Sequence, residues 1–381
     1  MLNPFFRILG ITLLLLLLGL AGRASTAATD VRTNPDKPRF GRWDFTPRLM
    51  WEVTELQGQV LEVPAELRVA ADGTLFLRDF PRGFSFVLDA DGKFIRAIAP
   101  KGDRPGELSQ YMNCFPTPGQ MAIGAMDALH FFDRQGNFIA AFPNNIFANF
   151  PGVFLTDREF LSSSGQVFSR PSGAMEIQRI NLDTGESEVF TTISTEGAPA
   201  PPSSNLAITV RGATPHVEMA LDPERGRVYL GRSDRYVIQV LDLKGNLKSS
   251  FGIDRKALPL TREAKEAHFA DVGLPAEQMQ NIVDGLPDVL TYYLRIQVVG
   301  DLVFVMATTG ISRQPTLVQI DVFSLDGEYL YRAPITFTGS EHVFGSPENL
   351  VIHPNSFYVS LENSDGGKRL ARYQIKLPEN P

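Results

Sequence analysis

Short apolar runs separated by tight turns dominate the chain, and the clearest example is Leu67–Glu107. Four such runs are divided by the turns Ala71-Asp-Gly73, Phe80-Pro-Arg-Gly83 and Ala90-Asp-Gly92. Asp, Gly and Pro tolerate or preset the backbone angles of hairpin loops, so the stretch predicts a four-stranded meander. One meander cannot bury both of its faces alone and therefore needs copies of itself beside it.

The copies are visible as glycine turns that flank outer strands. The turns are Asp91-Gly92, Gln135-Gly136, Thr184-Gly185, Lys244-Gly245, Asp326-Gly327 and Asp365-Gly366. The early turns lie roughly 45 residues apart, a spacing typical of propeller blades. We therefore predict an all-β, six-bladed β-propeller over residues 47–381, with blades at about 62–99, 111–142, 152–193, 216–253, 294–335 and 349–377.

The two ends of this repeat region fit together. The last copy has only three apparent strands, whereas an additional apolar stretch, Leu49–Leu61, precedes the first blade. We predict that this N-terminal strand completes the last blade, because such closure removes an exposed sheet edge. Residues 29–46 contain Pro35 and Pro38, are followed by Pro47 and show little periodicity, so we expect a disordered lead-in there.

Residues 254–293 break the strand pattern between the fourth and fifth blades. Residues 261–270 and 274–283 carry acidic side chains early in each run, and Thr261 suits a helix N-cap. We predict a short helical insertion. Insertions in repeat folds often form a binding face, although simple cover for apolar surface is the alternative.

The first 28 residues have the layout of a secretory signal peptide. Arg7 precedes an apolar run with six consecutive leucines at positions 13–18, and small residues follow at 24–28. An uncleaved membrane anchor is the alternative, but the apolar core is short for a span of ~20 residues. No cysteine lies near the cleavage region, which excludes a bacterial lipid anchor. We expect an exported protein, periplasmic or extracellular.

Charge and cysteine content narrow the function further. Removal of residues 1–28 takes away Arg7 and Arg23 and no acidic residue, so the formal net charge falls from −7 to −9. Nucleic-acid binding relies on basic surface, so we expect no nucleic-acid partner. The single cysteine, Cys114, lies in the apolar run 111–115 without an adjacent basic residue, which favours a buried side chain over a reactive thiol.

The link between the first two blades carries a motif. Residues 101–108 read Lys-Gly-Asp-Arg-Pro-Gly-Glu-Leu. With the preceding segment 86–96, this resembles the bacterial six-bladed β-propellers related to NHL-repeat proteins, in which a Gly-x-Gly-Pro-Gly-Glu-Phe segment occupies this link. Gly102, Pro105, Gly106 and Glu107 match, whereas Arg104 and Leu108 depart from the pattern.

The resemblance covers residues 49–377 and includes the helical insertion ending at 287–293. It implies the fold, and it implies mostly binding or scaffold roles, with lactonases and lyases among related propellers. The motif itself is expected to shape a connection, because Gly and Pro set turns.

The sequence lacks the common catalytic motifs. It contains no His-Glu-x-x-His, Gly-x-Ser-x-Gly, phosphate loop or cysteine pair, and its five histidines have no metal-ligand spacing. The starts of the predicted inner strands, which should meet at the channel mouth, instead offer hydrogen-bonding side chains: Glu66, Asn113, His216, Arg295 and Glu348 with Asn349.

Three uses of this ring stay open: a calcium site, a site for a small polar or peptide ligand, and a solvated lining. We expect no cofactor, because His216 and Arg295 dilute the oxygen ligands that Ca²⁺ requires. Arg295 suits a ligand carboxylate. Two functions follow: an exported, non-catalytic binding or scaffold propeller for a small polar ligand or a protein partner, or a Ca²⁺-assisted hydrolase or lyase with its site in the channel.

Overall fold

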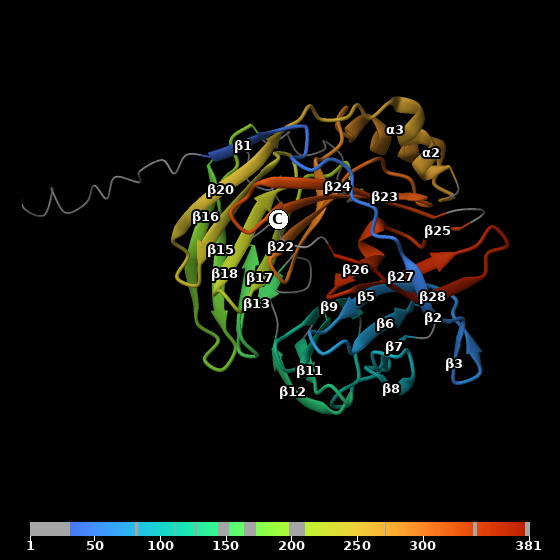
Figure 1. The fold of residues 1–381 in the computed structure, drawn as a ribbon. Coiled ribbons are helices and arrows are strands. Elements are labelled where there is room, and N and C mark those ends of the chain that lie inside the picture. The colour runs from blue at the N-terminus through green and yellow to red at the C-terminus, as the bar shows by residue number, and fades with distance from the viewer. Residues whose placement is uncertain are drawn as a thin grey trace, which may run out of the picture. The chain divides into compact units, whose positions relative to one another are not determined.

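Six antiparallel sheets follow one another along the chain and form the six blades of a β-propeller (Figure 1). The computed structural model describes residues 31–80, 83–109, 111–125, 128–143, 152–163, 173–197, 210–270, 272–337 and 341–377. The proposed signal peptide, residues 1–28, lies outside the described residues, and its cleavage stays a prediction.

Each blade contains consecutive strands, with the innermost strand first. The first three blades comprise β5 (Pro64–Val69), β6 (Leu75–Asp79), β7 (Phe84–Leu88) and β8 (Phe94–Ile98); β9 (Tyr111–Pro116), β10 (Met121–Ala125), β11 (Ala128–Phe132) and β12 (Phe138–Pro143); and β13 (Gly152–Phe154), β14 (Glu159–Ser163), β15 (Ala174–Asn181) and β16 (Ser187–Ser194).

The other three blades follow the same order: β17 (Val217–Asp222), β18 (Arg227–Arg232), β19 (Val237–Asp242) and β20 (Leu247–Asp254); β21 (Tyr293–Val299), β22 (Leu302–Ala307), β23 (Leu317–Ser324) and β24 (Tyr329–Thr336); and β26 (Leu350–His353), β27 (Ser356–Glu362) and β28 (Lys368–Gln374), with β25 (His342–Val343) beside β27. Neighbouring inner strands contact one another around the ring, from β5 through β9, β13, β17, β21 and β26 back to β5.

The closing strand of the sixth blade comes from the N-terminal side of the repeats. Strand β2 (Arg48–Val53) pairs antiparallel with β28, from Arg48 opposite Gln374 to Val53 opposite Leu370. This is the closure predicted for Leu49–Leu61, but it is shorter. Strands β3 (Glu55–Leu56) and β4 (Gln59–Val60) form a separate small hairpin.

The expectation of a disordered lead-in is wrong for residues 31–46. Strand β1 (Val31–Pro35) adds to the fourth blade in parallel with β20. Backbone bonds then tie the segment to the outer strand of the fifth blade, from the Phe40 N–H to Leu330 O and from the Arg332 N–H to Gly41 O. The segment therefore crosses the outer edges of the fourth and fifth blades before β2 closes the sixth (Figure 1).

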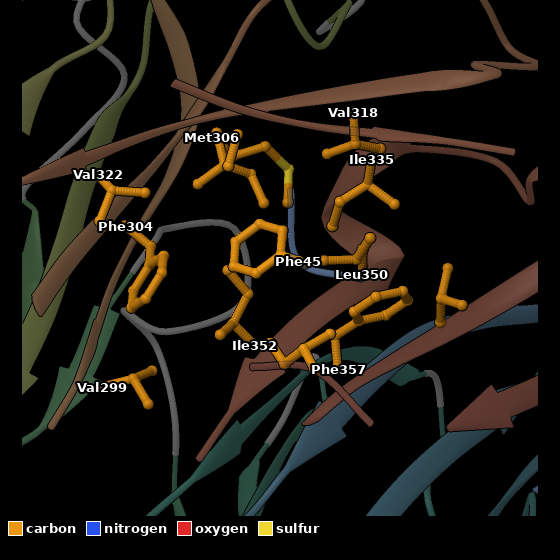
Figure 2. Close-up of a cluster of buried hydrophobic side chains, with 14 of the residues drawn as sticks. Phe45, Val299, Phe304, Met306, Val318, Val322, Ile335, Leu350, Ile352 and Phe357 are labelled. Carbon is orange, nitrogen blue, oxygen red and sulfur yellow. The ribbon is translucent and has the colours of Figure 1, made fainter. Parts of the chain in front are cut away.

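Two side chains anchor this segment. The Asn34 amide donates to Gly252 O (2.9 Å) and Gly327 O (2.8 Å), and its oxygen accepts from the Tyr329 N–H. Phe45 is 1% exposed and lies in the hydrophobic cluster between the fifth and sixth blades, near Phe304, Leu350 and Ile352 (Figure 2). The prolines suggested disorder, but proline is compatible with an extended segment on a sheet edge.

The helical insertion lies where the sequence places it, between β20 and β21. It contains α2 (Arg262–Phe269) and α3 (Ala276–Gly285), and the Thr261 side chain caps α2 by accepting from the Ala264 N–H. Their apolar residues form a cluster of their own, to which Val210 and Ile311 belong. No helix in the described parts of the chain is long and apolar enough to cross a membrane.

The segment Gly102-Asp-Arg-Pro-Gly-Glu107 shapes the link between the first two blades. The Gly102 N–H donates to Leu108 O (3.0 Å), and the Leu108 N–H donates to Pro100 O (2.8 Å). Gly106 has φ of +85°, and a side chain there would also press on Phe138. Glu107 accepts from the Arg104 N–H. The motif thus has the structural role expected from the sequence.

Candidate functional site

The inner strands surround a central cavity of about 820 Å³. Of the residues predicted at the channel mouth, Glu66, Asn113, Arg295, Glu348 and Asn349 all line it. They come from the first, second, fifth and sixth blades, so the fold brings together positions far apart in sequence. The volume lies within the range of small-ligand pockets.

Irregular strand pairing occurs at the level of these side chains. The register of β5 shifts between Pro64 and Leu67, that of β9 around the residue between Tyr111 and Asn113, and that of β21 between Tyr293 and Arg295. Glu66 itself has φ of +37°, which is uncommon for a residue with a side chain. Bulges redirect side chains and are frequent next to functional sites.

Glu66 and Arg68 form the part of the site on the first blade. The Arg68 guanidinium lies 3.0 Å from a Glu66 oxygen and also donates to Cys114 O. The same Glu66 oxygen accepts from the Cys114 N–H at 2.9 Å, and the other accepts from the Tyr111 hydroxyl. Burial and the nearby Glu66 charge raise the pKa of Tyr111, which therefore stays a donor. Both carboxylate oxygens of Glu66 thus accept hydrogen bonds from the protein.

Arg211 lies between two carboxylates. Its Nε is 3.1 Å from Glu348 Oε2, and its Nη1 is 3.6 Å from Glu218 Oε1. His216 does not line the cavity but lies behind Glu218, with Nε2 3.4 Å from the same Oε1. Its other nitrogen is near Thr214 O and the Ser233 hydroxyl. Its Nε2 is also 3.2 Å from Leu294 O. A role of His216 in ligand binding stays a prediction, because the residue is not among those that line the cavity.

Burial shifts the pKa values of Glu218 and His216 in opposite directions. It raises the pKa of Glu218 to about 7, with the Arg211 charge opposing the shift and the Glu348 charge adding to it. It lowers the pKa of His216 to about 4, and the positive charge of Arg211 adds to that shift. His216 is therefore neutral near pH 7, whereas Glu218 exchanges a proton in that range.

Arg295 is the arginine of this site that forms no ion pair with a carboxylate of the described residues. Its Nη1 donates to Glu348 O at 2.9 Å, and among the described residues no carboxylate lies within ion-pair distance of its guanidinium. Burial lowers its pKa to about 10, helped by the positive charge of Arg68 and opposed by the negative charges of Glu348 and Glu218 farther away. A half-buried guanidinium with one neutral acceptor has further N–H groups that could donate to an anion.

The oxygen atoms of this site do not fit Ca²⁺. Both Glu66 oxygens already accept hydrogen bonds, and the Asn349 amide is turned to Phe344 O. Asn113 Oδ1 is a buried acceptor without a hydrogen-bond partner among the described residues, but a side chain at Gly124 would meet it at 2.5 Å, so it faces the neighbouring strand. Three arginines line the same cavity. Across the described residues, no group of three or more His, Cys, Asp or Glu could hold a metal.

Five charged residues that line the cavity were missed from the sequence: Arg68, Arg211, Glu218, Asp222 and Glu224. Alternation along a strand predicts Arg68, which is two residues from Glu66. Arg211 belongs to the turn before β17, where no periodicity applies.

Cys114 is buried, as predicted. Burial, together with the negative charge of Glu66, raises the pKa of its thiol, which argues against a nucleophile.

Comparison with known proteins supports the fold alone. No protein-family model and no curated protein matches the chain. A solved structure of a duf4221 family member from Bacteroides vulgatus has a TM-score of 0.59 at 12% identity, covering 87% of this chain and 98% of its own. An inactive virginiamycin B lyase from Staphylococcus aureus, solved with quinupristin, has a TM-score of 0.42 at 11% identity, covering 84% and 83%. The relation to NHL-repeat proteins stays a prediction.

Proposed function

We propose that this chain is a binding propeller that recognises a small ligand with an anionic group in its central channel. The observation that carries the proposal is the Arg295 guanidinium, which lines the cavity without a carboxylate partner in the described residues. The neighbouring arginines differ from it, because Arg68 pairs with Glu66 and Arg211 with Glu348. A ligand carboxylate or phosphate would supply the missing partner.

The alternative of Ca²⁺-assisted catalysis has less support. Its oxygen ligands are engaged in protein hydrogen bonds, and the arginines would repel a cation. A binding role requires only the arrangement described above, in which bulged strands hold fixed charges around a cavity of ligand size.

Replacement of Arg295 tests the proposal. In a screen of small carboxylates and phosphates, a ligand of the wild-type protein should bind Arg295→Ala roughly tenfold to a hundredfold more weakly, because a hydrogen bond to a charged group is lost. The melting temperature should change by less than about 5 °C, since the side chain makes one hydrogen bond to the protein. Isothermal titration calorimetry and thermal melts measure the two effects.

Arg48→Ala is the matched control, because Arg48 is exposed on the outer strand β2 and its loss changes the net charge equally. Equal weakening by both variants would point to a general charge effect and would contradict the channel site. Unfolding of Arg295→Ala would instead make Arg295 a structural tie between blades.

We further propose that the protein acts after export, in the periplasm or outside the cell. The support is the apolar, leucine-rich run at 8–20 followed by small residues. N-terminal sequencing of protein from its native host should find a first residue between about Arg23 and Asp30. A membrane-bound protein that still begins at Met1 would contradict export by cleavage.

A further inference from the structure

We propose that the channel ligand is an amphiphilic monoanion, in which a single carboxylate or similar group is followed by an apolar body. This inference rests on the proposed anion site and extends it along the channel. Glu66, Arg211, Glu218, Arg295 and Glu348 lie at or before the first halves of the inner strands. The later parts of the same strands contribute apolar residues, called the wall below, together with Arg68, Asp222, Gln297 and His353.

Every inner strand contributes to that wall. Each supplies at least one apolar residue to the cavity lining: Val69, Phe115, Val153, Leu221, Val298 and Val351. Val69, Leu221 and Val298 remain partly exposed, although they lie inside the ring. Leu221 and Val298 both lie three residues beyond a charged residue of the site, Glu218 and Arg295. The wall therefore follows the charged level directly along the strands.

The charges favour one anionic group over two. Arg68 already forms an ion pair with Glu66, and Arg211 forms ion pairs with Glu348 and Glu218. Arg295 is the one lining arginine without a carboxylate in the described part of the chain. A second anionic group farther along would meet apolar side chains and the carboxylates of Asp222 and Glu224, and it would lose its hydration without a cationic partner. A fully polar ligand would likewise leave the wall unused.

A series of straight-chain carboxylates tests this inference by calorimetry: acetate, butanoate, hexanoate and octanoate. Each added methylene that reaches the wall should tighten binding roughly threefold to fourfold. Dicarboxylates of the same length should bind more weakly than the monocarboxylates, and alkylammonium ions should not bind. Arg295→Gln should weaken the whole series by a common factor.

Wall variants separate the two parts of the ligand. Val298→Thr keeps the side-chain shape but adds a hydroxyl, so it should weaken octanoate severalfold and leave acetate unchanged. Val60→Thr is the control, because Val60 is 60% exposed outside the channel.

The outcomes distinguish this inference from the proposed function. Carboxylate binding that depends on Arg295 but not on chain length would overturn the amphiphile and leave the anion site standing. Tighter binding of dicarboxylates than of monocarboxylates would do the same. No binding by any of these carboxylates would overturn the amphiphile alone if a phosphate still binds. Binding unaffected by Arg295→Gln, or no binding by any carboxylate or phosphate, would overturn both.

Discussion

Phe45→Ala is expected to destabilise the protein by about 3–5 kcal/mol, although the residue lies in a segment that the sequence marks as unstructured. Phe45 is 1% exposed and contributes to the cluster between the fifth and sixth blades (Figure 2). Its ring centroid is 6.5 Å from that of Phe304. Truncation removes buried apolar surface and leaves a cavity that a close-packed sheet interface fills only partly.

Phe40→Ala is the control for this prediction. Phe40 belongs to the same segment and packs against Tyr331 in a tilted arrangement, but it is 39% exposed. It should cost less than about 1 kcal/mol. Chemical denaturation followed by tryptophan fluorescence measures both variants. Similar small losses would mean that the segment adds little to stability and that the propeller is held by its blades alone.

The fold was largely predictable because its signals are local. Glycine turns such as Asp91-Gly92 and Asp326-Gly327 lie within a few residues of the strands that they join. Every blade repeats such signals, so an error in one copy is corrected by the others. The closing strand was predictable for a related reason, since a three-stranded last blade requires a partner.

The lead-in was missed because its partners are distant in sequence. Asn34 bonds to Gly252 and Gly327, and neither contact leaves a trace in the composition of residues 29–46. Prolines there indicate only the absence of a helix, and they do not distinguish a free segment from one held against a sheet edge. Long-range pairing of this kind is seen only in the structure.

The position of the candidate site was predictable, but the ion pairs and hydrogen bonds among its side chains were not. The starts of the inner strands identified Glu66, Asn113, Arg295 and Asn349 as lining residues. The sequence could not show that Glu66 would be occupied by Arg68 and Tyr111 while Arg295 stays without a carboxylate. Those differences depend on bulges and on rotamers, and they decide which residue is available to a ligand.

The second large effect is expected at Asp321, a carboxylate buried between the fourth and fifth blades. It is 0% exposed and accepts hydrogen bonds from the hydroxyls of Tyr236 and Tyr329. Both of its oxygens also accept from Arg255, at 2.7 and 3.1 Å. Asp321→Ala should cost about 3–5 kcal/mol, because it removes the buried carboxylate partner of a mostly buried guanidinium and the acceptor of two hydroxyls.

Asp36→Ala provides the matched comparison, because Asp36 contacts the same Arg255 at 2.8 Å but is 39% exposed. Its removal should cost at most about 1 kcal/mol. The double variant Asp321→Ala with Arg255→Met should recover part of the loss, since it leaves no uncompensated charge. Equal effects of the two aspartates in urea denaturation, or a double variant no more stable than Asp321→Ala, would contradict this account. The stability of the blade interface would then come from its apolar cluster around Phe251 and Phe323.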